Sequence, residues 1–188
     1  MTSISKILVI GDTHIPTRAS RIPVLIETHI TSKQYNMVLC TGDLVEPSVL
    51  NFLKNIAPTK VVVGNMDYLD LPEYEVVNIN NIRIGLIHGH QVRPRGDIRK
   101  LSRIAYDMNV KILICGHTHV PLVKKVMVDD KEILILNPGS ATGVWSGGGG
   151  SLIPSFMELE IISSGNVSIT LYELKGNILT KSSYSVII

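Results

Sequence analysis

Five short segments of this 188-residue sequence combine glycine with aspartate, asparagine or histidine, side chains that bind first-row divalent metal ions. The segments are Gly11-Asp12-Thr13-His14, Gly42-Asp43, Gly64-Asn65-Met66-Asp67, His88-Gly89-His90 and Gly116-His117-Thr118-His119. A carboxylate such as Asp43 can bridge two ions roughly 3.5–4 Å apart, and such ion pairs polarise phosphoryl oxygens and lower the pKa of bound water. No cysteine stands at a spacing typical of structural zinc. The residue types therefore predict a binuclear hydrolytic centre.

Each segment also has a purely structural interpretation, which explains some segments better than others. A lone Gly-Asp pair, as at Asp43, is more often a turn and a helix cap than a metal site. His117 and His119, two residues apart beyond a strand, have little structural purpose and favour metal binding by themselves. Asp12 and His14 share that spacing, and we expect an extended backbone to direct both side chains of each pair to one face. Five such segments together favour one shared site.

The elements that must position these segments are short apolar runs that predict buried strands. The runs cover residues 6–10, 37–40, 60–63, 82–87 and 112–115, and helical patterns cover residues 22–30, 47–56 and 97–107. Short apolar strands separated by helices indicate a parallel sheet covered on both faces. Ligands of such sheets bind beyond the carboxyl ends of the strands, so one edge would receive all five segments. We expect the glycines to let the backbone turn sharply there, which would direct the next side chain into the crevice.

The C-terminal part of the chain changes to strands joined by hairpins. Residues 122–128, 133–136, 156–162, 167–174 and 179–188 have strand patterns, with turns at Asp129-Asp130 and Lys175-Gly176-Asn177. The outline is an α/β half followed by a mostly antiparallel half. No internal repeat, linker or charge block divides the chain, so we expect one domain over residues 1–188.

The composition excludes several classes of protein. A 45% hydrophobic and 18% charged chain argues against disorder, and a net charge of +2 makes nucleic-acid binding an unsupported function. The charge-free run over residues 133–157 contains Asn-Pro-Gly-Ser and a run of four glycines, so it predicts no transmembrane helix. Two cysteines, Cys40 and Cys115, fall in apolar runs and are expected to pack. With no signal peptide, a cytoplasmic location is expected.

The motif series GDTH, GD, GN, HGH and GHTH resembles that of the calcineurin-like metallophosphoesterases. It is most similar to their small single-domain branch, which contains prokaryotic phosphodiesterases and the retromer subunit of the same fold. The resemblance extends through residues 11–16, 40–44, 84–96, 137–143 and 153–156. It implies a four-layer α/β/β/α sandwich with antiparallel C-terminal strands. It also implies a metal-dependent phosphodiesterase that activates water for attack on phosphorus in a small-molecule phosphodiester.

The resemblance also implies a metal ligand set. One ion would be held by Asp12, His14, Asp43 and His119, and the second by Asp43, Asn65, His88 and His117. Mn²⁺ is the expected metal, with Zn²⁺, Fe²⁺ or Ni²⁺ as alternatives. Asn65 and His90 are the candidate catalytic residues. His90 would either contact the substrate phosphate or hydrogen-bond a metal ligand, and both interpretations stay open.

One position departs from the family pattern. Many members carry a histidine after Gly-Asn, where this chain has Met66, which cannot donate a proton. General acid catalysis is typically worth ~10²–10⁴-fold in rate. The eukaryotic retromer subunit commonly lacks the aspartate and asparagine that stand here as Asp43 and Asn65, so this chain resembles metal-competent members. Residues 86–92, 139–143 and 153–156 nevertheless resemble the retromer subunit, and the alternative function is a retromer-like scaffold for a protein partner in membrane trafficking.

Two smaller signals have structural and functional interpretations. His29 lies on the apolar side of a helical pattern and is expected to pack. A basic cluster after the His-Gly-His segment either steers a phosphodiester or an acidic partner, or forms a solvated surface. The cluster comprises Arg93, Arg95, Arg99, Lys100 and Arg103.

Overall fold

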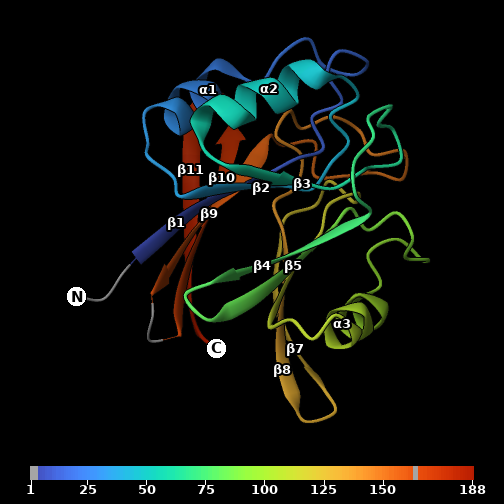
Figure 1. Cartoon of the computed structure of the whole chain (residues 1–188). Helices are drawn as coiled ribbons and strands as arrows, with labels where there is room; N and C mark the ends of the chain where they lie inside the picture. Colours follow the sequence, from blue (N-terminus) through green and yellow to red (C-terminus); the bar gives the residue numbers. More distant parts are fainter. Residues whose placement is uncertain (1–3, 163–164) are drawn as a thin grey trace.

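A six-stranded sheet joins the two ends of the chain in the computed structural model, which describes residues 4–162 and 165–188 (Figure 1). Its strands, in spatial order, are β11 (Ile178–Ile187), β10 (Asn166–Lys175), β9 (Ser155–Ile162), β1 (Ile4–Ile10), β2 (Met37–Cys40) and β3 (Thr59–Val61). The strands β1, β2 and β3 are parallel, whereas β9, β10 and β11 pair antiparallel. The strands from the two ends of the chain therefore share one sheet.

A second, five-stranded sheet comes from the middle of the chain. Its strands, in spatial order, are β4 (Tyr74–Ile79), β5 (Ile82–Ile87), β6 (Ile112–Ile114), β8 (Lys131–Asn137) and β7 (Leu122–Val128). The three central strands are parallel and both edge strands are antiparallel. The predicted change along the chain, from an α/β half to a mostly antiparallel half, is confirmed, but each sheet combines both pairings, which the sequence did not predict. Strand β4 was not predicted; only Val77 and Ile79 of this edge strand are buried.

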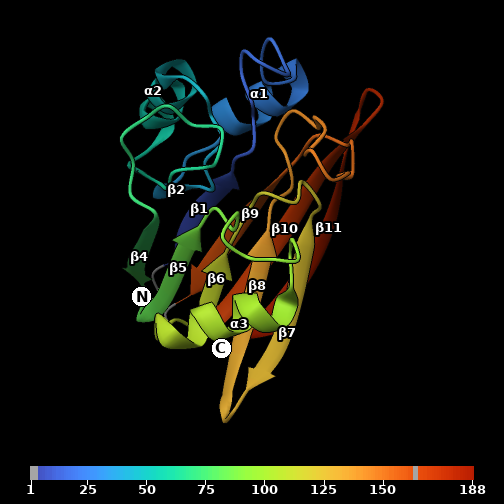
Figure 2. The ribbon, with the colours of Figure 1, turned by 90° about the vertical axis from the view of Figure 1, so that its right-hand side faces the viewer.

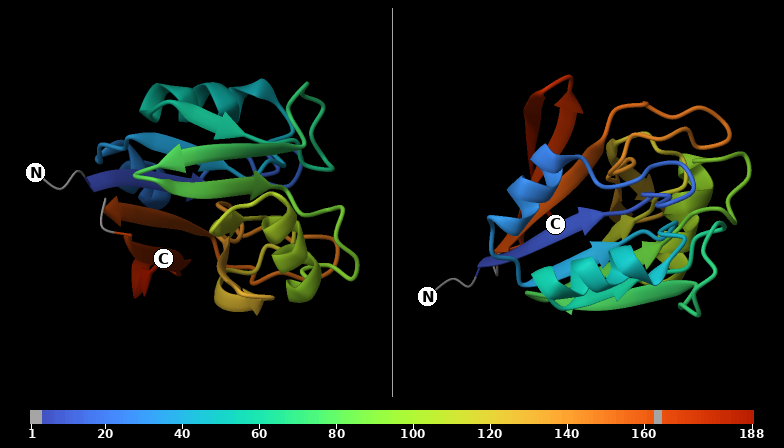
Figure 3. Two further views of the ribbon diagram at one scale, coloured as in Figure 1. Left: turned by 60° about the horizontal axis from the view of Figure 1, so that its bottom comes forward. Right: turned by 90° about the horizontal axis from the view of Figure 1, so that it is seen from above.

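Three apolar clusters hold the two sheets and three helices together. The largest lies between the sheets and joins Val9 of β1 to Leu86 of β5 and Ile114 of β6. A second packs α1 (Val24–Thr31) and α2 (Pro47–Ile56) on the six-stranded sheet, and a third packs α3 (Ile98–Asp107) on the five-stranded sheet. Figures 1 and 3 show α1 and α2 on one side of the molecule and α3 on the other. The predicted α/β class with antiparallel C-terminal strands is confirmed.

The residues that precede α1 and α3 account for where these two helices begin. The α1 helix begins two residues later than its apolar pattern predicts, with Pro23 at its N-cap. The α3 helix begins after Asp97, whose side chain accepts hydrogen bonds from the backbone N–H groups of Arg99 and Lys100. No helix among residues 4–162 and 165–188 is long and apolar enough to cross a membrane. The charge-free run over residues 133–157 instead forms most of β8, a loop and the start of β9.

The strand directions bring the glycine-containing segments to one place. Figure 2 shows β1, β5 and β6 running in the same direction, so that the loops after them gather at one end of the sandwich. Backbone hydrogen bonds tie these loops across long sequence separations. Asp12 N–H donates to the Gly42 carbonyl over 2.8 Å, and Gly116 N–H donates to the His88 carbonyl over 2.8 Å.

Candidate metal centre

Four predicted ligands form a buried group between the loops after β1, β2 and β6. Each of Asp12, His14, Asp43 and His119 offers one ligand atom, and these atoms lie within 4.8 Å of one another. His14 Nε2 lies 3.1 Å from His119 Nε2 and 3.3 Å from Asp43 Oδ2, and His119 Nε2 lies 3.3 Å from Asp12 Oδ1. All four side chains are at most 2% exposed, so water cannot compensate these polar atoms freely.

A second group adjoins the first through a shared carboxylate. His88 Nε2 lies 3.4 Å from Asp43 Oδ2 and 3.2 Å from Asn65 Oδ1. The His117 ring centroid is 5.1 Å from that of His88. Because the same Asp43 oxygen contacts both His14 and His88, the two groups meet at this carboxylate. The structure therefore brings all seven sequence-predicted metal ligands into one place.

The histidine tautomers show that this donor set fits a metal ion. His88 Nδ1 lies 2.7 Å from the Thr41 carbonyl, and His119 Nδ1 lies 2.6 Å from the Val144 carbonyl. A carbonyl oxygen only accepts hydrogen bonds, so each Nδ1 carries the hydrogen and the Nε2 atom of the neutral ring presents a lone pair. Those lone pairs face carboxylate and amide oxygens, which are also acceptors. Buried acceptors converge in this way where a cation lies between them.

The pKa values of the histidines and of Asp43 depend on the same close packing of buried polar groups. Although burial lowers the pKa of His88, its hydrogen bond to Asp43 and the charge of Asp12 raise it to about 9. Burial raises the pKa of Asp43, but the hydrogen bond from His88 brings it to about 2. A proton on His88 thus satisfies this carboxylate in the absence of a metal. Burial lowers the pKa values of His14 and His117 to about 4, so both imidazoles are neutral at neutral pH, the form that binds metals.

The ligand backbones are not extended, contrary to the sequence prediction. Positive φ angles, which non-glycine residues rarely adopt, occur at five predicted ligands: Asp12 (50°), His14 (48°), Asp43 (52°), His117 (68°) and His119 (57°). Each such residue costs of order 1–3 kcal/mol, and strain of this kind concentrates at functional sites. His117 and His119 consequently do not share a face. His119 contacts His14 in the first group, whereas His117 lies beside His88 in the second.

The glycines beside the ligands mainly provide space. A Cβ atom on Gly11 would lie 1.9 Å from Thr41 Oγ1, and one on Gly64 would lie 2.1 Å from Asp43 Oδ1. One on Gly116 would lie 2.3 Å from an oxygen of Asp12. Whereas Gly42 and Gly89, with φ angles of 89° and 103°, fit the expected sharp turn, these three glycines do not have a left-handed backbone and do not make it. They let the carboxylates approach the neighbouring main chain.

Asp67 positions the loop of Asp43, a role that the sequence analysis missed. Its Oδ1 atom accepts hydrogen bonds from the N–H groups of Leu44 and Val45, both over 2.7 Å. Its Oδ2 atom accepts from Asp43 N–H over 2.9 Å and from Gly64 N–H over 2.8 Å. A carboxylate two residues after the predicted ligand Asn65 was the available signal.

Asp12 is positioned by three further groups. Thr41 Oγ1 donates to Asp12 Oδ2 over 3.1 Å, and His117 N–H donates to Oδ1 over 3.0 Å. Ser140 Oγ donates to the Asp12 carbonyl over 2.7 Å. Ser140 falls in the 137–143 segment that resembles the family, although the sequence analysis assigned it no role.

His90 lies beside the second group. Its ring centroid is 5.4 Å from that of His88 and 6.3 Å from that of His117. Burial and the neighbouring His88 charge lower its pKa. Its buried Nδ1 atom has no hydrogen-bond partner among the described residues. This position agrees with either predicted role for His90.

The basic cluster does not act as one surface. Arg95 Nη2 donates to the carbonyls of His117 over 2.6 Å and Ser146 over 2.9 Å, so this arginine belongs to the site. Arg103 instead pairs with Asp107 on the exposed side of α3, over 3.2 Å. His29 lies elsewhere, 3.0 Å from Glu158, as its predicted structural role requires.

Comparisons with known proteins give this site a family context. A profile of the calcineurin-like phosphoesterase superfamily domain matches residues 6–160. A probable metallophosphoesterase from Methanocaldococcus jannaschii is 42% identical over 134 residues, which span 71% of this chain and 67% of that protein. A probable metallophosphoesterase from Methanothermobacter thermautotrophicus is 39% identical over 137 residues, 71% of this chain and 76% of that protein.

Solved structures of Vps29 proteins share the fold. Wild-type Vps29 from Entamoeba histolytica in complex with Zn²⁺ has a TM-score of 0.86 and 38% identity, covering 96% of this chain and 98% of that chain. Vps29 from Cryptosporidium parvum has a TM-score of 0.89 and 31% identity, covering 98% and 99%. Vps29 from Chaetomium thermophilum, crystallised with a cyclic peptide, has a TM-score of 0.76 and 26% identity, covering 97% and 96%.

Proposed function

The chain belongs to the calcineurin-like phosphoesterase superfamily, and from that premise we propose that it is a phosphodiesterase with a binuclear divalent-metal centre. One observation carries the proposal: seven oxygen and nitrogen donors converge in two groups that share the Asp43 carboxylate. In this proposal the protein acts as a single domain over residues 1–188 in the cytoplasm. Its substrate is a small-molecule phosphodiester.

The two donor groups correspond to the two proposed ions. Asp12, His14, Asp43 and His119 would hold the first, and Asp43, Asn65, His88 and His117 the second. Mn²⁺ is the expected metal, with Zn²⁺, Fe²⁺ and Ni²⁺ as alternatives. When bound, such ions polarise a phosphoryl oxygen and lower the pKa of bound water for attack on phosphorus. The Zn²⁺ complex of Entamoeba Vps29 supports metal binding by this fold.

The chain's own side chains would orient the reacting groups. Asp67 and Thr41 hold the two carboxylates in place, through hydrogen bonds to the Asp43 loop and to Asp12. His90, whose pKa burial lowers, is neutral at neutral pH and has one N–H to offer a phosphoryl oxygen. Asn65 lies next to the second group and would contact the substrate as well as a metal.

Met66 limits the proposed activity. Its backbone N–H donates to Asp43 Oδ1 over 2.8 Å, a contact that needs no particular side chain. Its thioether cannot protonate a leaving group, so the reaction would lack general acid help from this position. Loss of such help lowers rates typically by ~10²–10⁴-fold. The proposed enzyme is therefore slow toward substrates with poor leaving groups.

The second candidate function is a retromer-like scaffold that binds a protein partner and retains metal without turnover. The observation that favours it is the likeness to Vps29 proteins over nearly the whole chain, including one crystallised with a peptide. Two exposed apolar side chains also lie beside the metal centre, one next in sequence to His119 and one next to Val144, whose carbonyl His119 contacts. Trp145 is 57% exposed and Val120 is 46% exposed.

Hydrolysis of an aryl phosphodiester with added Mn²⁺ separates the two candidates. We expect turnover by the native chain and its loss in Asp43→Asn, which removes the shared ligand charge. Asp107→Asn on exposed α3 is the matched control and should keep full activity. Turnover that survives Asp43→Asn would overturn the proposal. Absence of turnover in the metal-loaded protein, with stoichiometric capture of a protein partner, would favour the scaffold.

A further inference from the structure

Trp145 is the single tryptophan of the sequence and lies on the loop of residues 138–154, between β8 and β9. It is 57% exposed, although tryptophan offers a protein a large apolar surface to bury. One exposed apolar side chain is ordinary at a protein surface. Trp145 differs from such a residue because its main chain is tied to the metal centre.

The carbonyls of Val144 and Trp145 accept hydrogen bonds from side chains of the site. His119 Nδ1 donates to the Val144 carbonyl over 2.6 Å, and Arg18 Nη1 donates to the Trp145 carbonyl over 2.7 Å. The backbone N–H of Arg18 in turn donates to the His14 carbonyl over 2.8 Å. Two ligands of the first donor group, His14 and His119, therefore fix the backbone that carries the indole ring.

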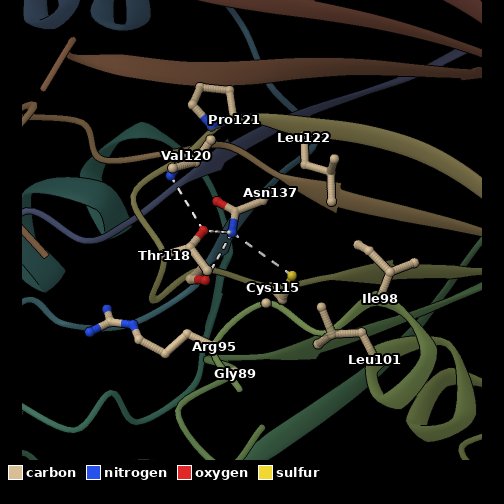
Figure 4. Close-up of a pocket in the computed structure, with 12 residues that line it drawn as sticks. Gly89, Arg95, Ile98, Leu101, Cys115, Thr118, Val120, Pro121, Leu122 and Asn137 are labelled. Atoms are coloured by element: carbon tan, nitrogen blue, oxygen red, sulfur yellow. Dashed lines mark hydrogen bonds between the residues drawn. The ribbon is translucent and has the colours of Figure 1, made fainter. Parts of the chain in front are cut away.

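Arg95 holds the same loop from the side of the second donor group. Its Nη2 atom donates to the Ser146 carbonyl over 2.9 Å and to the His117 carbonyl over 2.6 Å. Figure 4 shows this guanidinium pointing away from Ile98 and Leu101, two α3 side chains that line the neighbouring cavity. The charged end of Arg95 therefore contacts the loop of Trp145 rather than the apolar part of that cavity.

The glycines of this loop bring it against His119. Ser151 N–H donates to the His119 carbonyl over 3.0 Å. A Cβ atom on Gly150 would lie 3.2 Å from His119 Cβ, and one on Gly148 would lie 3.2 Å from Arg95 Nη1. The four-glycine run thus allows a close approach, and the loop contacts His119 both before and after Trp145.

The indole ring has one covered face and one open face. The Arg18 guanidinium carbon lies over the ring, 5.9 Å from its centroid, which is a cation–π contact. With more than half of Trp145 exposed, the opposite face is open to a ligand. Planar aromatic groups stack on such a face, and each stacked nucleobase raises affinity by about 5- to 150-fold.

One imidazole ring separates the Trp145 loop from the first donor group. His119 presents Nε2 to His14 and Asp12, and it presents Nδ1 to the Val144 carbonyl. A phosphate bound beside His119 would therefore have the Trp145 loop next to it. A nucleoside or an aryl group linked to that phosphate is long enough to reach the indole ring.

We propose that the open face of Trp145 stacks on a planar aromatic group of the phosphodiester substrate, either a nucleobase or an aryl ring. The inference rests on the proposed function and narrows its substrate class to aromatic diesters. Arg18 is a positioning residue, because it holds the Trp145 carbonyl and lies against the indole ring. Diesters with alkyl groups alone offer no π-face and would bind more weakly.

Two pairs of probes test the stacking without turnover in the Mn²⁺-loaded protein. AMP and ribose 5-phosphate differ by a nucleobase, whereas phenylphosphonate and methylphosphonate differ by an aryl ring. Calorimetric titration should show the aromatic member bound about 5- to 150-fold more tightly in at least one pair. A preference confined to one pair identifies the group that stacks, and a preference in both pairs indicates a face that accepts either group. Equal affinities within both pairs would overturn the proposal.

Substitutions of Trp145 separate stacking from simple apolar contact. Trp145→Leu keeps an apolar side chain and should abolish the preference, whereas Trp145→Phe keeps a ring and should retain a reduced preference. Leu152→Ala removes another exposed apolar side chain of the same loop and is the matched control, which should keep the full preference. A preference that survives Trp145→Leu would overturn the proposal.

The single tryptophan also provides a direct readout, because the tryptophan emission of the chain comes from Trp145 alone. The favoured aromatic probe should change this emission as it binds, whereas its non-aromatic counterpart should leave it nearly unchanged. Tight binding of the aromatic probe with unchanged emission would place its ring elsewhere and overturn the proposal.

The hydrolysis assay of the proposed function separates the two claims. Turnover of the aryl phosphodiester that is lost in Asp43→Asn, together with equal binding within both probe pairs, would overturn the stacking and leave the proposed function. Binding of an aromatic phosphate that depends on Trp145, without any turnover, would overturn the proposed function and leave an aromatic phosphate-binding site.

Discussion

The metal centre and a second buried group around Glu158 use the same residue types with opposite results. Glu158, 5% exposed on β9, lies 2.6 Å from Tyr35 Oη, 3.0 Å from His29 Nε2 and 3.3 Å from Lys6 Nζ. Donors therefore surround this carboxylate. At the metal centre Asp43 Oδ2 meets the Nε2 atoms of His14 and His88, and neither imidazole donates to it unless its Nε2 atom carries a proton. One arrangement is complete without a ligand, and the other needs a proton or a metal cation.

The pKa values of Glu158 and Tyr35 also distinguish the Glu158 group from the metal centre. Burial raises the pKa of Glu158, yet hydrogen bonds from Tyr35 and His29 and the charge of Lys6 bring it below its ordinary value. Burial and the hydrogen bond to Glu158 raise the pKa of Tyr35, which keeps this hydroxyl a donor. The comparison shows that a histidine beside a buried carboxylate indicates a metal only where donors do not balance acceptors.

The largest expected effect comes from removing one histidine from each group. His14→Ala should lower Mn²⁺ affinity at least about 100-fold, because it deletes a ligand rather than a residue that supports one. His29→Ala should leave Mn²⁺ affinity unchanged. Titration of both purified variants with Mn²⁺ by calorimetry makes the measurement. Equal Mn²⁺ affinities in His14→Ala and His29→Ala would contradict the distinction between the metal centre and the Glu158 group.

Metal removal should destabilise the native chain by an amount that rises with the logarithm of the metal concentration divided by Kd. Ligand at a thousandfold excess over Kd stabilises a protein by about 4 kcal/mol, which corresponds to roughly 8–16 °C in Tm for a chain of this size. Scanning calorimetry with Mn²⁺ and with a chelator measures the difference. In Glu158→Gln the difference should persist, since that group binds no metal in this account. If the chelator leaves the Tm of the native chain unchanged, the chain holds no stabilising metal ion.

Glu158→Gln should lower the free energy of unfolding by about 1–3 kcal/mol, because it leaves buried donors without a charged acceptor. Urea denaturation of the chelator-treated protein measures this change. Glu160→Gln on the same strand is the matched control, because Glu160 is exposed and its contact with Lys6 is 4.0 Å long. Equal stability of the two variants would show that the Glu158 group is not a structural ion cluster.

The smallest effect concerns pH. A carboxyl whose folded pKa lies below its unfolded value of 4.5 stabilises the fold above that pH and loses this contribution as the pH falls through the folded pKa. The stability difference between the native chain and Glu158→Gln should therefore shrink below about pH 4.5. Denaturant midpoints at several pH values provide the test. A stability difference between the native chain and Glu158→Gln that grows as the pH falls would contradict this prediction.

The sequence predicted the metal centre better than it predicted the Glu158 group. The seven predicted ligands lie in short motifs at the ends of strands, so local patterns identified their segments and the family resemblance assigned them as ligands. Their strained backbones and the separation of His117 from His119 depend on packing between loops, which spacing does not report. Glu158 meets His29 and Tyr35 across 129 and 123 residues, and no local pattern records that meeting. The mixed sheets escaped prediction for the same reason, since β9 returns to pair with β1.

Metal stoichiometry tests the central claim most directly. Elemental analysis of the chain after reconstitution with Mn²⁺ and removal of free metal should find two ions per chain. Asp43→Asn should lose both, because this carboxylate belongs to both donor groups. His29→Ala should keep two. One ion or none in the native chain, or two ions retained by Asp43→Asn, would contradict a binuclear centre built around Asp43.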